Sequence, residues 1–153
     1  MYVVQTKTNE RIEVEILPVT EHDYSRLEGE RFYFDLKEEK EFNVYKLTVK
    51  GQDEILGLVS LDFIDSESRI EIRLLATTKE NRGHQKKYDR IAGGLIAFAA
   101  RLSIRMYSIS PCISLIPKTE LREHYKKTYY MKEAGRSVFT DGIDLVKLSV
   151  EYE

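Results

Sequence analysis

Six consecutive residues, most of them polar or basic, are candidates for binding an anion. They are Arg82, Gly83, His84, Gln85, Lys86 and Lys87. They follow an apolar run, residues 69–78, that has the composition of a β-strand. Lysine and arginine bind phosphate through charge-assisted hydrogen bonds, and a loop that leads into a helix can add backbone N–H groups. The pattern predicts a phosphate site, although a solvated basic loop in a charge-rich protein explains it equally well.

The element that would hold this loop in place is a helix within residues 82–102. Its apolar residues recur at steps of four, three and four and are Ile91, Leu95, Phe98 and Leu102. Basic side chains crowd its expected first turns, where the helix dipole disfavours cations, and only Asp89 has the opposite sign. Cations at this position are mildly unfavourable unless an anion sits among them. Gly93 and Gly94 each cost about 1 kcal/mol relative to alanine, which is tolerable where something packs closely against them.

Composition limits the classes of protein to consider. A length of 153 residues predicts one domain, 1–153. A net charge of −2 predicts no nucleic-acid partner, and no apolar run reaches the roughly 18 residues that a membrane span needs. The single cysteine, Cys112, fits a reducing compartment, and the start of the chain lacks a signal pattern, so we expect a cytoplasmic protein. The three histidines lack metal-ligand spacing, and no metal is expected.

The remaining periodicity predicts an α+β fold. Strands are expected at 3–17, 43–50 and 55–63, around Ile70 and Ile72, and at 108–116. The runs from 43 to 74 have short turns between them and indicate an antiparallel meander, in which Gly57 marks a bulge or a close approach. A short helix is expected at 20–27, with a Thr20–Asp23 capping box at its start and a stop near Gly29. A second helix is expected at 118–132, with a stop at Gly135.

The end of the chain has two interpretations. Residues 145–152 alternate like a strand that follows an Asp141-Gly142 hairpin turn, and Leu145, Leu148 and Tyr152 also fit a helical stripe. The order of elements places a helix between two strands that could lie side by side, as in a crossover connection.

Two segments resemble motifs of the GNAT superfamily of N-acetyltransferases. In that family, the loop after the strand reads Arg or Gln, two residues, Gly, one residue, then Gly or Ala, and its N–H groups hold the pyrophosphate of acetyl-CoA. Counted from Arg82, Gln85 and Lys87 stand at the two small positions. Glycine permits close backbone approach to phosphate, so this loop would be rebuilt or would use lysine and arginine side chains instead.

The second segment, 118–130, reads KTELREHYKKTYY. It is similar to the family's Asn-x-x-Ala-x-x-aromatic-Tyr-x-Lys-x-Gly-Phe. In this register Tyr125, Lys127 and Tyr130 match the tyrosine, the lysine and the phenylalanine. The departures are Lys118, Leu121, His124 and Tyr129.

The resemblance implies a GNAT-like mixed, mainly antiparallel sheet flanked by helices, with acetyl-CoA as cofactor. Backbone N–H groups around Leu74, Leu75 and Ala76 would face the pantetheine arm and the thioester, and residues 82–87 would face the pyrophosphate. Tyr125 would protonate the leaving thiolate. Glu71 would accept the proton of the amine, with Glu67 and Asp62 in reserve.

Each of these side chains also has a plainer interpretation. Tyr125 shares a helix face with Leu121 and can be a packing residue, and Glu71 can be a solvated residue on the polar side of its strand. Three functions therefore stay open. The first is an acetyl-CoA-dependent N-acetyltransferase acting on a primary amine of a small molecule or a protein. The second is a GNAT-fold interaction or regulatory module without cofactor binding, and the third is a nucleic-acid binder, which the acidic remainder of the chain disfavours.

Overall fold

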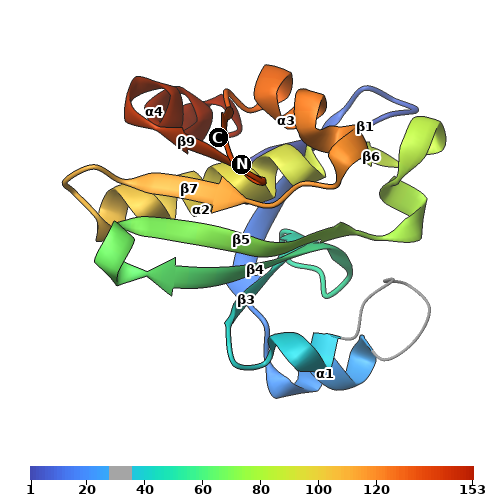
Figure 1. Cartoon of the computed structure of the whole chain (residues 1–153). Helices are drawn as coiled ribbons and strands as arrows, with labels where there is room; N and C mark the ends of the chain where they lie inside the picture. The colour runs from blue at the N-terminus through green and yellow to red at the C-terminus, as the bar shows by residue number, and fades with distance from the viewer. Residues whose placement is uncertain (28–35) are drawn as a thin grey trace. The chain divides into compact units, whose positions relative to one another are not determined.

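The computed structural model of the chain describes residues 1–27 and 36–153 (Figure 1). Two compact units are present, residues 1–60 with 74–95 and residues 61–73 with 96–153. The described residues form a nine-stranded sheet with the order β6-β1-β2-β3-β4-β5-β7-β9-β8. Strands β6, β1, β2 and β3 lie in the first unit and β7, β9 and β8 in the second, whereas β4, β5 and α2 each contribute residues to both. The predicted α+β class is confirmed, and the single domain stays a prediction.

The first unit begins with a hairpin where one extended run was predicted. The strands β1 (Tyr2–Gln5) and β2 (Arg11–Pro18) pair antiparallel, with Val3 opposite Ile12. The turn between them closes through the N–H of Asn9, which donates to the carbonyl of Gln5 at 2.8 Å, and Asn9 has a φ of 60°. Asparagine tolerates this left-handed conformation better than most residues, which is the turn signal that the apolar alternation concealed. The sheet continues with β3 (Asn43–Val49), which pairs antiparallel with β2.

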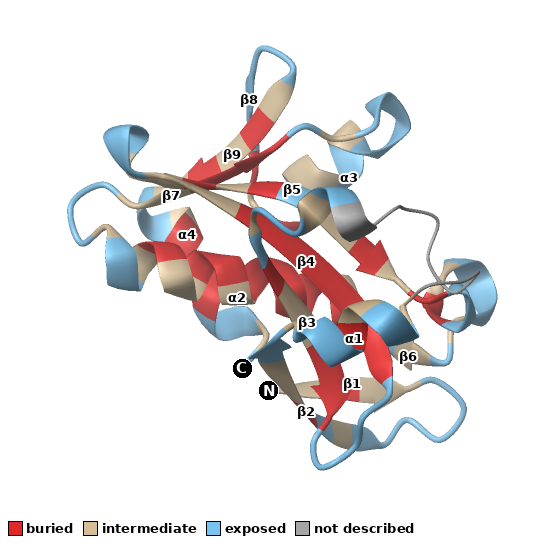
Figure 2. Ribbon diagram, turned by 90° about the horizontal axis from the view of Figure 1, so that it is seen from below, coloured by how far each residue is buried: buried red, intermediate tan, exposed pale blue. Residues whose placement is uncertain are grey.

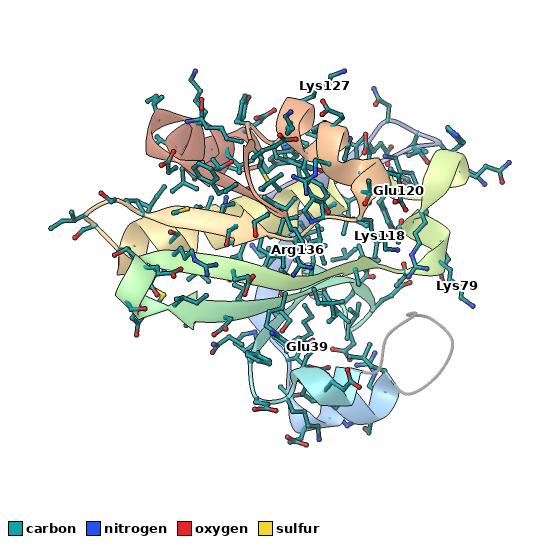
Figure 3. The ribbon with its side chains drawn as sticks, viewed as in Figure 1. Glu39, Lys79, Lys118, Glu120, Lys127 and Arg136 are labelled. Carbon is teal, nitrogen blue, oxygen red and sulfur yellow. The ribbon has the colours of Figure 1, made fainter. Side chains whose placement is uncertain are left out.

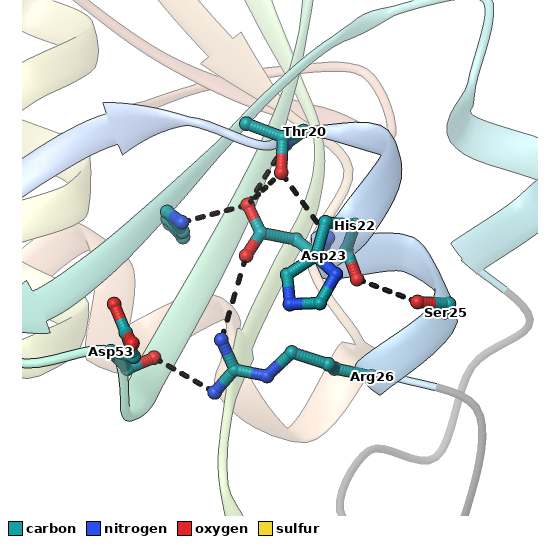
Figure 4. A network of polar contacts seen from close by, with 7 residues as sticks. Thr20, His22, Asp23, Ser25, Arg26 and Asp53 are labelled. Carbon is teal, nitrogen blue, oxygen red and sulfur yellow. Dashed lines mark hydrogen bonds and ion pairs between the residues drawn. The ribbon is translucent and has the colours of Figure 1, made fainter.

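Helix α1 (Glu21–Arg26) has the predicted capping box (Figure 4). The hydroxyl of Thr20 accepts from the N–H of Asp23 at 3.2 Å, and the Asp23 carboxylate accepts from the N–H of Thr20 at 2.8 Å. The same carboxylate, which is almost fully buried, accepts a 2.7 Å hydrogen bond from Nζ of Lys46 on β3. The helix ends at Arg26, and Gly29, where we expected the stop, lies outside the described residues. The short 3-10 helix η1 (Leu36–Glu39) precedes β3.

The predicted meander is confirmed as neighbouring strands β3, β4 (Ile55–Ile64) and β5 (Arg69–Thr77), with the 3-10 turn η2 (Asp65–Glu67) between the last two. Strand β4 is buried along most of its length (Figure 2). Gly57 is the predicted close approach, because a Cβ there would lie 2.7 Å from Cγ2 of Ile91. After β5 come the 3-10 turns η3 (Lys79–Asn81) and η4 (Gly83–Gln85), the short strand β6 (Tyr88–Asp89) and helix α2 (Ile91–Met106).

In the second unit, the predicted crossover is confirmed. Strands β5 and β7 (Cys112–Leu115) pair in parallel, from Arg69 opposite Cys112 to Ile72 opposite Leu115, and α2 connects them. The strand predicted at 108–116 is shorter than expected. Pro111, which has no N–H to donate to a ladder, and Ser110, with a φ of 56°, precede it.

The helix predicted at 118–132 is wrong at both ends. It comprises a 3-10 turn, η5 (Thr119–Leu121), and α3 (Arg122–Thr128). Tyr130 has a φ of 56°, which ends the helical path, and buried Thr140 donates its hydroxyl hydrogen bond to the carbonyls of Tyr129 and Tyr130, each at 3.1 Å. Gly135 therefore turns a hairpin between β8 (Lys132–Ala134) and β9 (Ser137–Asp141) and does not end a helix.

The strand interpretation of residues 145–152 is wrong, and the helical stripe is right. Helix α4 (Gly142–Glu151) buries Leu145 and Leu148 completely, while Val146 and Val150, which the strand alternation would bury beside Leu148, stay exposed. The expected hairpin turn at Asp141-Gly142 is wrong for the same reason, since Asp141 is the N-cap of this helix. Within the described ranges, the helices are too short or too polar to cross a bilayer.

Candidate functional site

A surface pocket of ≈ 350 Å³ lies in the first unit, between the β1–β2 turn and the segment from β5 to α2. Its lining residues are predominantly polar or basic and are Gln5, Thr6, Lys7, Glu80, Gln85, Lys86 and Lys87. The volume is within the range of small-molecule sites. Three lysines and one glutamate give the lining a formal charge of +2, which favours an anionic ligand. Three of the six predicted loop residues therefore line one pocket.

The backbone of this pocket is fixed by hydrogen bonds from two polar side chains. Thr6 donates through its hydroxyl to the carbonyl of Lys86 at 2.6 Å and through its N–H to the carbonyl of Lys87 at 3.0 Å. Asn81, which is only 7% exposed, accepts from the N–H of Tyr88 at 2.9 Å. The N–H of Lys87 donates to the carbonyl of Glu80 at 2.8 Å. Because the N–H groups of Lys87 and Tyr88 are used within the chain, these two groups are not available to donate to a phosphate in the pocket.

Two of the predicted cations have partners of their own. Arg82 donates from its guanidinium to the carbonyl of Thr77 at 2.6 and 2.9 Å, so this side chain holds the turn after β5. Lys86 donates to the carboxylate of Asp89 at 2.8 Å, and the same carboxylate accepts from the N–H of Arg90 at 2.9 Å. The hydrogen bond from Lys86 lowers the pKa of Asp89 despite some burial, so the carboxylate is charged at neutral pH.

This arrangement corrects one expectation about α2. The basic residues do not occupy its first turns, because the helix begins only at Ile91 and residues 82–90 form 3-10 turns and β6. Asp89, the residue of opposite sign in this segment, pairs with Lys86 and accepts from the N–H of Arg90.

The strand residues predicted to face the thioester also lie in the first unit. Ala76 is only 4% exposed and belongs to a core cluster with Val44, Ile55 and Leu58, against which Leu74 packs. Leu75 is half-buried. The side chains of Leu74 and Ala76 are therefore part of the core, so these two residues could contact a ligand only through their backbone.

Tyr125, the predicted proton donor, lies on α3 in the second unit and is half-buried. Its ring centroid is 5.7 Å from that of buried Tyr129 and 5.9 Å from that of His124. Burial raises the pKa of the Tyr125 phenol, which keeps the proton in place at neutral pH. Lys127, the lysine of the same motif, is exposed on the outer side of α3 (Figure 3).

Glu71, the predicted base, is half-buried on the β5 part of the second unit and stands opposite Ser114 of β7. On the same face, Arg69 donates to the hydroxyl of Ser114 at 2.8 Å and pairs with Glu67. Glu67, named as a reserve base, is therefore committed to an ion pair. The roles of Glu71 and Tyr125 stay predictions.

Cys112 has none of the features of a nucleophile. It is half-buried at the start of β7, and burial raises the pKa of its thiol, which keeps it protonated. In the part of the chain that the structure describes, histidine, cysteine and carboxylate side chains do not gather in a group of three or more that could hold a metal ion.

The pocket residues from the β1–β2 turn, Gln5, Thr6 and Lys7, were missed from the sequence. They reach the loop because β1 pairs with β6, with Gln5 opposite Tyr88. Thr6 and Lys86 are 80 positions apart, and β6 is only two residues long, so no local periodicity signals the pairing.

No protein-family model matches the chain, and a search of curated proteins finds no match either. Solved structures do match it over nearly their whole length. A structure of AtaTR bound with AcCoA aligns with a TM-score of 0.61 and 14% identity, over 89% of this chain and 98% of that one. Ard1 from Thermoplasma volcanium aligns with a TM-score of 0.59 and 15% identity, over 84% and 97%. Nourseothricin acetyltransferase aligns with a TM-score of 0.55 and 10% identity, over 84% of this chain and 98% of that one.

The chain has the GNAT fold. Identities of 10–15% show the fold and no more, so the activity of this GNAT-fold chain needs support from its own residues.

From the net charge we expected no nucleic-acid partner, and this exclusion is wrong. A structure of the AtaT–AtaR complex bound to DNA aligns with a TM-score of 0.60 and 15% identity, over 90% of this chain and 99% of that chain. A GNAT-fold protein therefore occurs in an assembly on DNA. Global charge fails as an argument because binding depends on local charge and on partners.

Proposed function

We propose that this chain is an acetyl-CoA-dependent N-acetyltransferase that moves the acetyl group to a primary amine by direct attack on the thioester. The GNAT fold of its solved neighbours, one an acetyltransferase and one bound with AcCoA, supports acyl transfer in general. The observation that carries the proposal is the pocket with a formal charge of +2, because residues of the predicted pyrophosphate loop line it.

The residues fit an anionic cofactor through their charge. Acetyl-CoA, when bound, would supply the thioester whose acetyl group is transferred. Lys86 and Lys87 would neutralise phosphate oxygens, and backbone N–H groups near Leu74 would donate to the pantetheine arm. Glu71 would remove a proton from the ammonium form of the acceptor, because only the free amine is nucleophilic.

Tyr125 would act as the general acid for the thiolate. A phenol is a suitable donor because its ordinary pKa of 10.0 is close to that of a thiol. Burial raises the pKa of Tyr125, which keeps its proton in place at neutral pH.

The substitution Tyr125→Phe tests this role. It removes the proton and keeps the ring among its neighbours, so we expect kcat to fall by about 100-fold or more while the affinity for acetyl-CoA stays within about twofold. Release of free thiol during the reaction measures kcat, and calorimetry measures the affinity.

Tyr107→Phe is the matched control. The Tyr107 hydroxyl donates to Asp65 at 2.6 Å, also in the second unit, and its removal should leave kcat unchanged. A fall of kcat in both variants would make the loss a general effect of removing a phenol, and an unchanged kcat in Tyr125→Phe would exclude Tyr125 as the acid.

A GNAT-fold interaction module without a cofactor is the second candidate. Gln85 and Lys87 at the two small positions of the loop favour it, as does the use of the Lys87 and Tyr88 N–H groups within the chain. This function predicts no binding of acetyl-CoA and no turnover with any amine.

A further inference from the structure

We propose that Lys7, on the β1–β2 turn, binds the same phosphate groups as Lys86 and Lys87, so that lysine side chains from two distant segments form one diphosphate site. The ligand class is a diphosphate ester. That the ester is acetyl-CoA rests on the proposed function, whereas the site itself rests on the pocket.

The first argument is the charge around the pocket. Among the described residues Lys7 has no ion-pair partner, and Lys87 lies over the ring of Tyr88, 5.3 Å from its centroid, which leaves its charge uncompensated. Lys86 is the lysine whose charge is balanced, by Asp89. The charges of Lys7 and Lys87 exceed that of Glu80, the carboxylate in the lining, so the pocket favours a negatively charged ligand.

The second argument is that the two segments are held in register. Val4 stands opposite Asp89 and Gln5 opposite Tyr88 in the β1–β6 pair. Thr6 then adds three hydrogen bonds to the carbonyls of Lys86 and Lys87, at 2.6, 3.0 and 3.2 Å. Lys7 follows Thr6 directly, so its Cα is fixed beside the loop, and only the flexible side chain must be ordered when a ligand binds.

The third argument is the kind of contact that remains available. The N–H groups of Lys87 and Tyr88 already donate within the chain, whereas the side chains of Lys7 and Lys87 have no carboxylate partner in the described part of the chain and can bind phosphate. An ammonium binds phosphate as a point charge and imposes little geometry. Binding should therefore weaken strongly with salt, and arginine should replace Lys7 with little loss.

Calorimetry with three probes tests the site, namely acetyl-CoA, ADP and inorganic pyrophosphate, each with the wild type and with Lys7→Gln. In low salt we expect the variant to bind all three about tenfold more weakly, which corresponds to about 1.4 kcal/mol. Lys7→Arg should restore most of the affinity, and the wild-type advantage should shrink in about 0.5 M salt. Lys147→Gln, an exposed lysine on α4 of the second unit, is the charge-matched control and should bind like the wild type.

The outcomes separate the two proposals. Equal affinity of the wild type and Lys7→Gln for all three probes would overturn the lysine site and leave the acetyltransferase proposal standing. Binding of ADP that depends on Lys7, with no binding of acetyl-CoA and no turnover, would keep the site and reject the acetyltransferase. If Lys147→Gln weakened binding of the three probes as much as Lys7→Gln does, the diphosphate site would also be overturned. The same would follow if the chain bound a single-stranded oligonucleotide in a Lys7-dependent way but did not bind ADP.

Discussion

At the start of α2, the Asp89 carboxylate bonds both Lys86 and the N–H of Arg90, where the predicted phosphate ligand would bring negative charge. The carboxylate and the ligand therefore compete for the charge of Lys86. Substituting Asp89 by asparagine keeps an oxygen for the Arg90 N–H and removes the negative charge. We expect Asp89→Asn to bind acetyl-CoA or ADP about two to five times more tightly, as the value of an exposed ion pair suggests.

The control for this change is Asp144→Asn on α4 in the second unit, which alters the net charge equally. Calorimetry at fixed ionic strength compares the two variants. Tighter binding by both would indicate a general effect of net charge, and weaker binding by Asp89→Asn would mean that the carboxylate shapes the pocket and does not compete for Lys86.

The pKa of Tyr125 makes a second prediction at the scale of the residue. The active form of a general acid is the protonated one, and burial raises the Tyr125 pKa above the ordinary value of 10.0. We expect kcat at saturating substrate to stay level through pH 9 and to begin falling only above pH 10.0. A basic limb centred near pH 8 would show that another group limits the reaction.

The sequence predicts individual residues where their chemistry depends on neighbours along the chain. The basic loop at 82–87 was recognised because its lysines are adjacent, and three of its members line the pocket. Lys7 was missed because it reaches the pocket only through the pairing of β1 with β6. The ion pair between Lys86 and Asp89 could have been expected from their spacing of three, but its competition with a ligand could not.

At the scale of the element, α1 depends on Asp23, which caps the helix and pairs with Lys46. Burial alone would raise the Asp23 pKa, but the hydrogen bonds from Lys46 and Thr20 outweigh it and lower the pKa below 3.8. The substitution Asp23→Asn keeps the capping oxygen and removes the charge. We expect it to lower the free energy of unfolding by about 2 kcal/mol at pH 7, which is somewhat less than the cost of breaking a fully buried ion pair.

The pH dependence of this loss follows from the sign of the shift. A lowered carboxyl pKa stabilises the fold above the unfolded value, and the stabilisation disappears as the pH falls through the folded value. The difference between wild type and Asp23→Asn in urea unfolding should therefore shrink as the pH falls below 3.8. A difference that is constant between pH 7 and pH 3 would assign the stabilisation to packing and not to charge.

Gly57, which packs against α2, and Gly94, which lies within α2, should respond to alanine substitution in opposite ways. A Cβ on Gly57 would lie 2.7 Å from Cγ2 of Ile91 and 3.1 Å from the backbone oxygen of Ala76, so Gly57→Ala should destabilise the fold by about 1–3 kcal/mol. A Cβ on Gly94 would lie 3.6 Å from Leu47 and from Met1, an ordinary contact. Gly94→Ala should therefore gain up to about 1 kcal/mol of helix propensity. Thermal unfolding of both variants checks the signs, and two changes of the same sign would contradict the packing.

Periodicity predicted the elements that are buried on one side and failed where two periods fit the same residues. In residues 145–152 the apolar positions fit both alternation and a helical stripe, and the burial of Leu145 with Leu148 decides for the helix. In the first strand, alternation on both sides of residues 6–10 concealed a turn whose signal is Asn9. Helix α3 ends early through Tyr130 and Thr140, a contact between segments that no local pattern reports.

At the scale of the whole molecule, the order of elements was the most informative part of the sequence. A helix between two apolar strands predicted the parallel pairing of β5 and β7, and the structure confirms it. The GNAT resemblance predicted the fold that the solved neighbours share. The acceptor amine could not be predicted, because acceptor recognition depends on loops and surface side chains that vary independently of the fold.

Net charge was the weakest guide at this scale. A value of −2 describes the whole chain, whereas the pocket on the first unit has a formal charge of +2. A ligand or partner responds to the local charge within about 10 Å, the distance over which salt screens it.

Thermal unfolding with and without acetyl-CoA tests whether the first unit binds the diphosphate of this cofactor. A ligand at 100 times its dissociation constant stabilises the native state by about 2.7 kcal/mol, which raises the Tm of a chain of this size by roughly 5–10 °C. We predict such a rise for the wild type and a smaller one for Lys7→Gln at the same concentration. An unchanged Tm at millimolar acetyl-CoA would show that this unit does not bind the cofactor and would favour the interaction module.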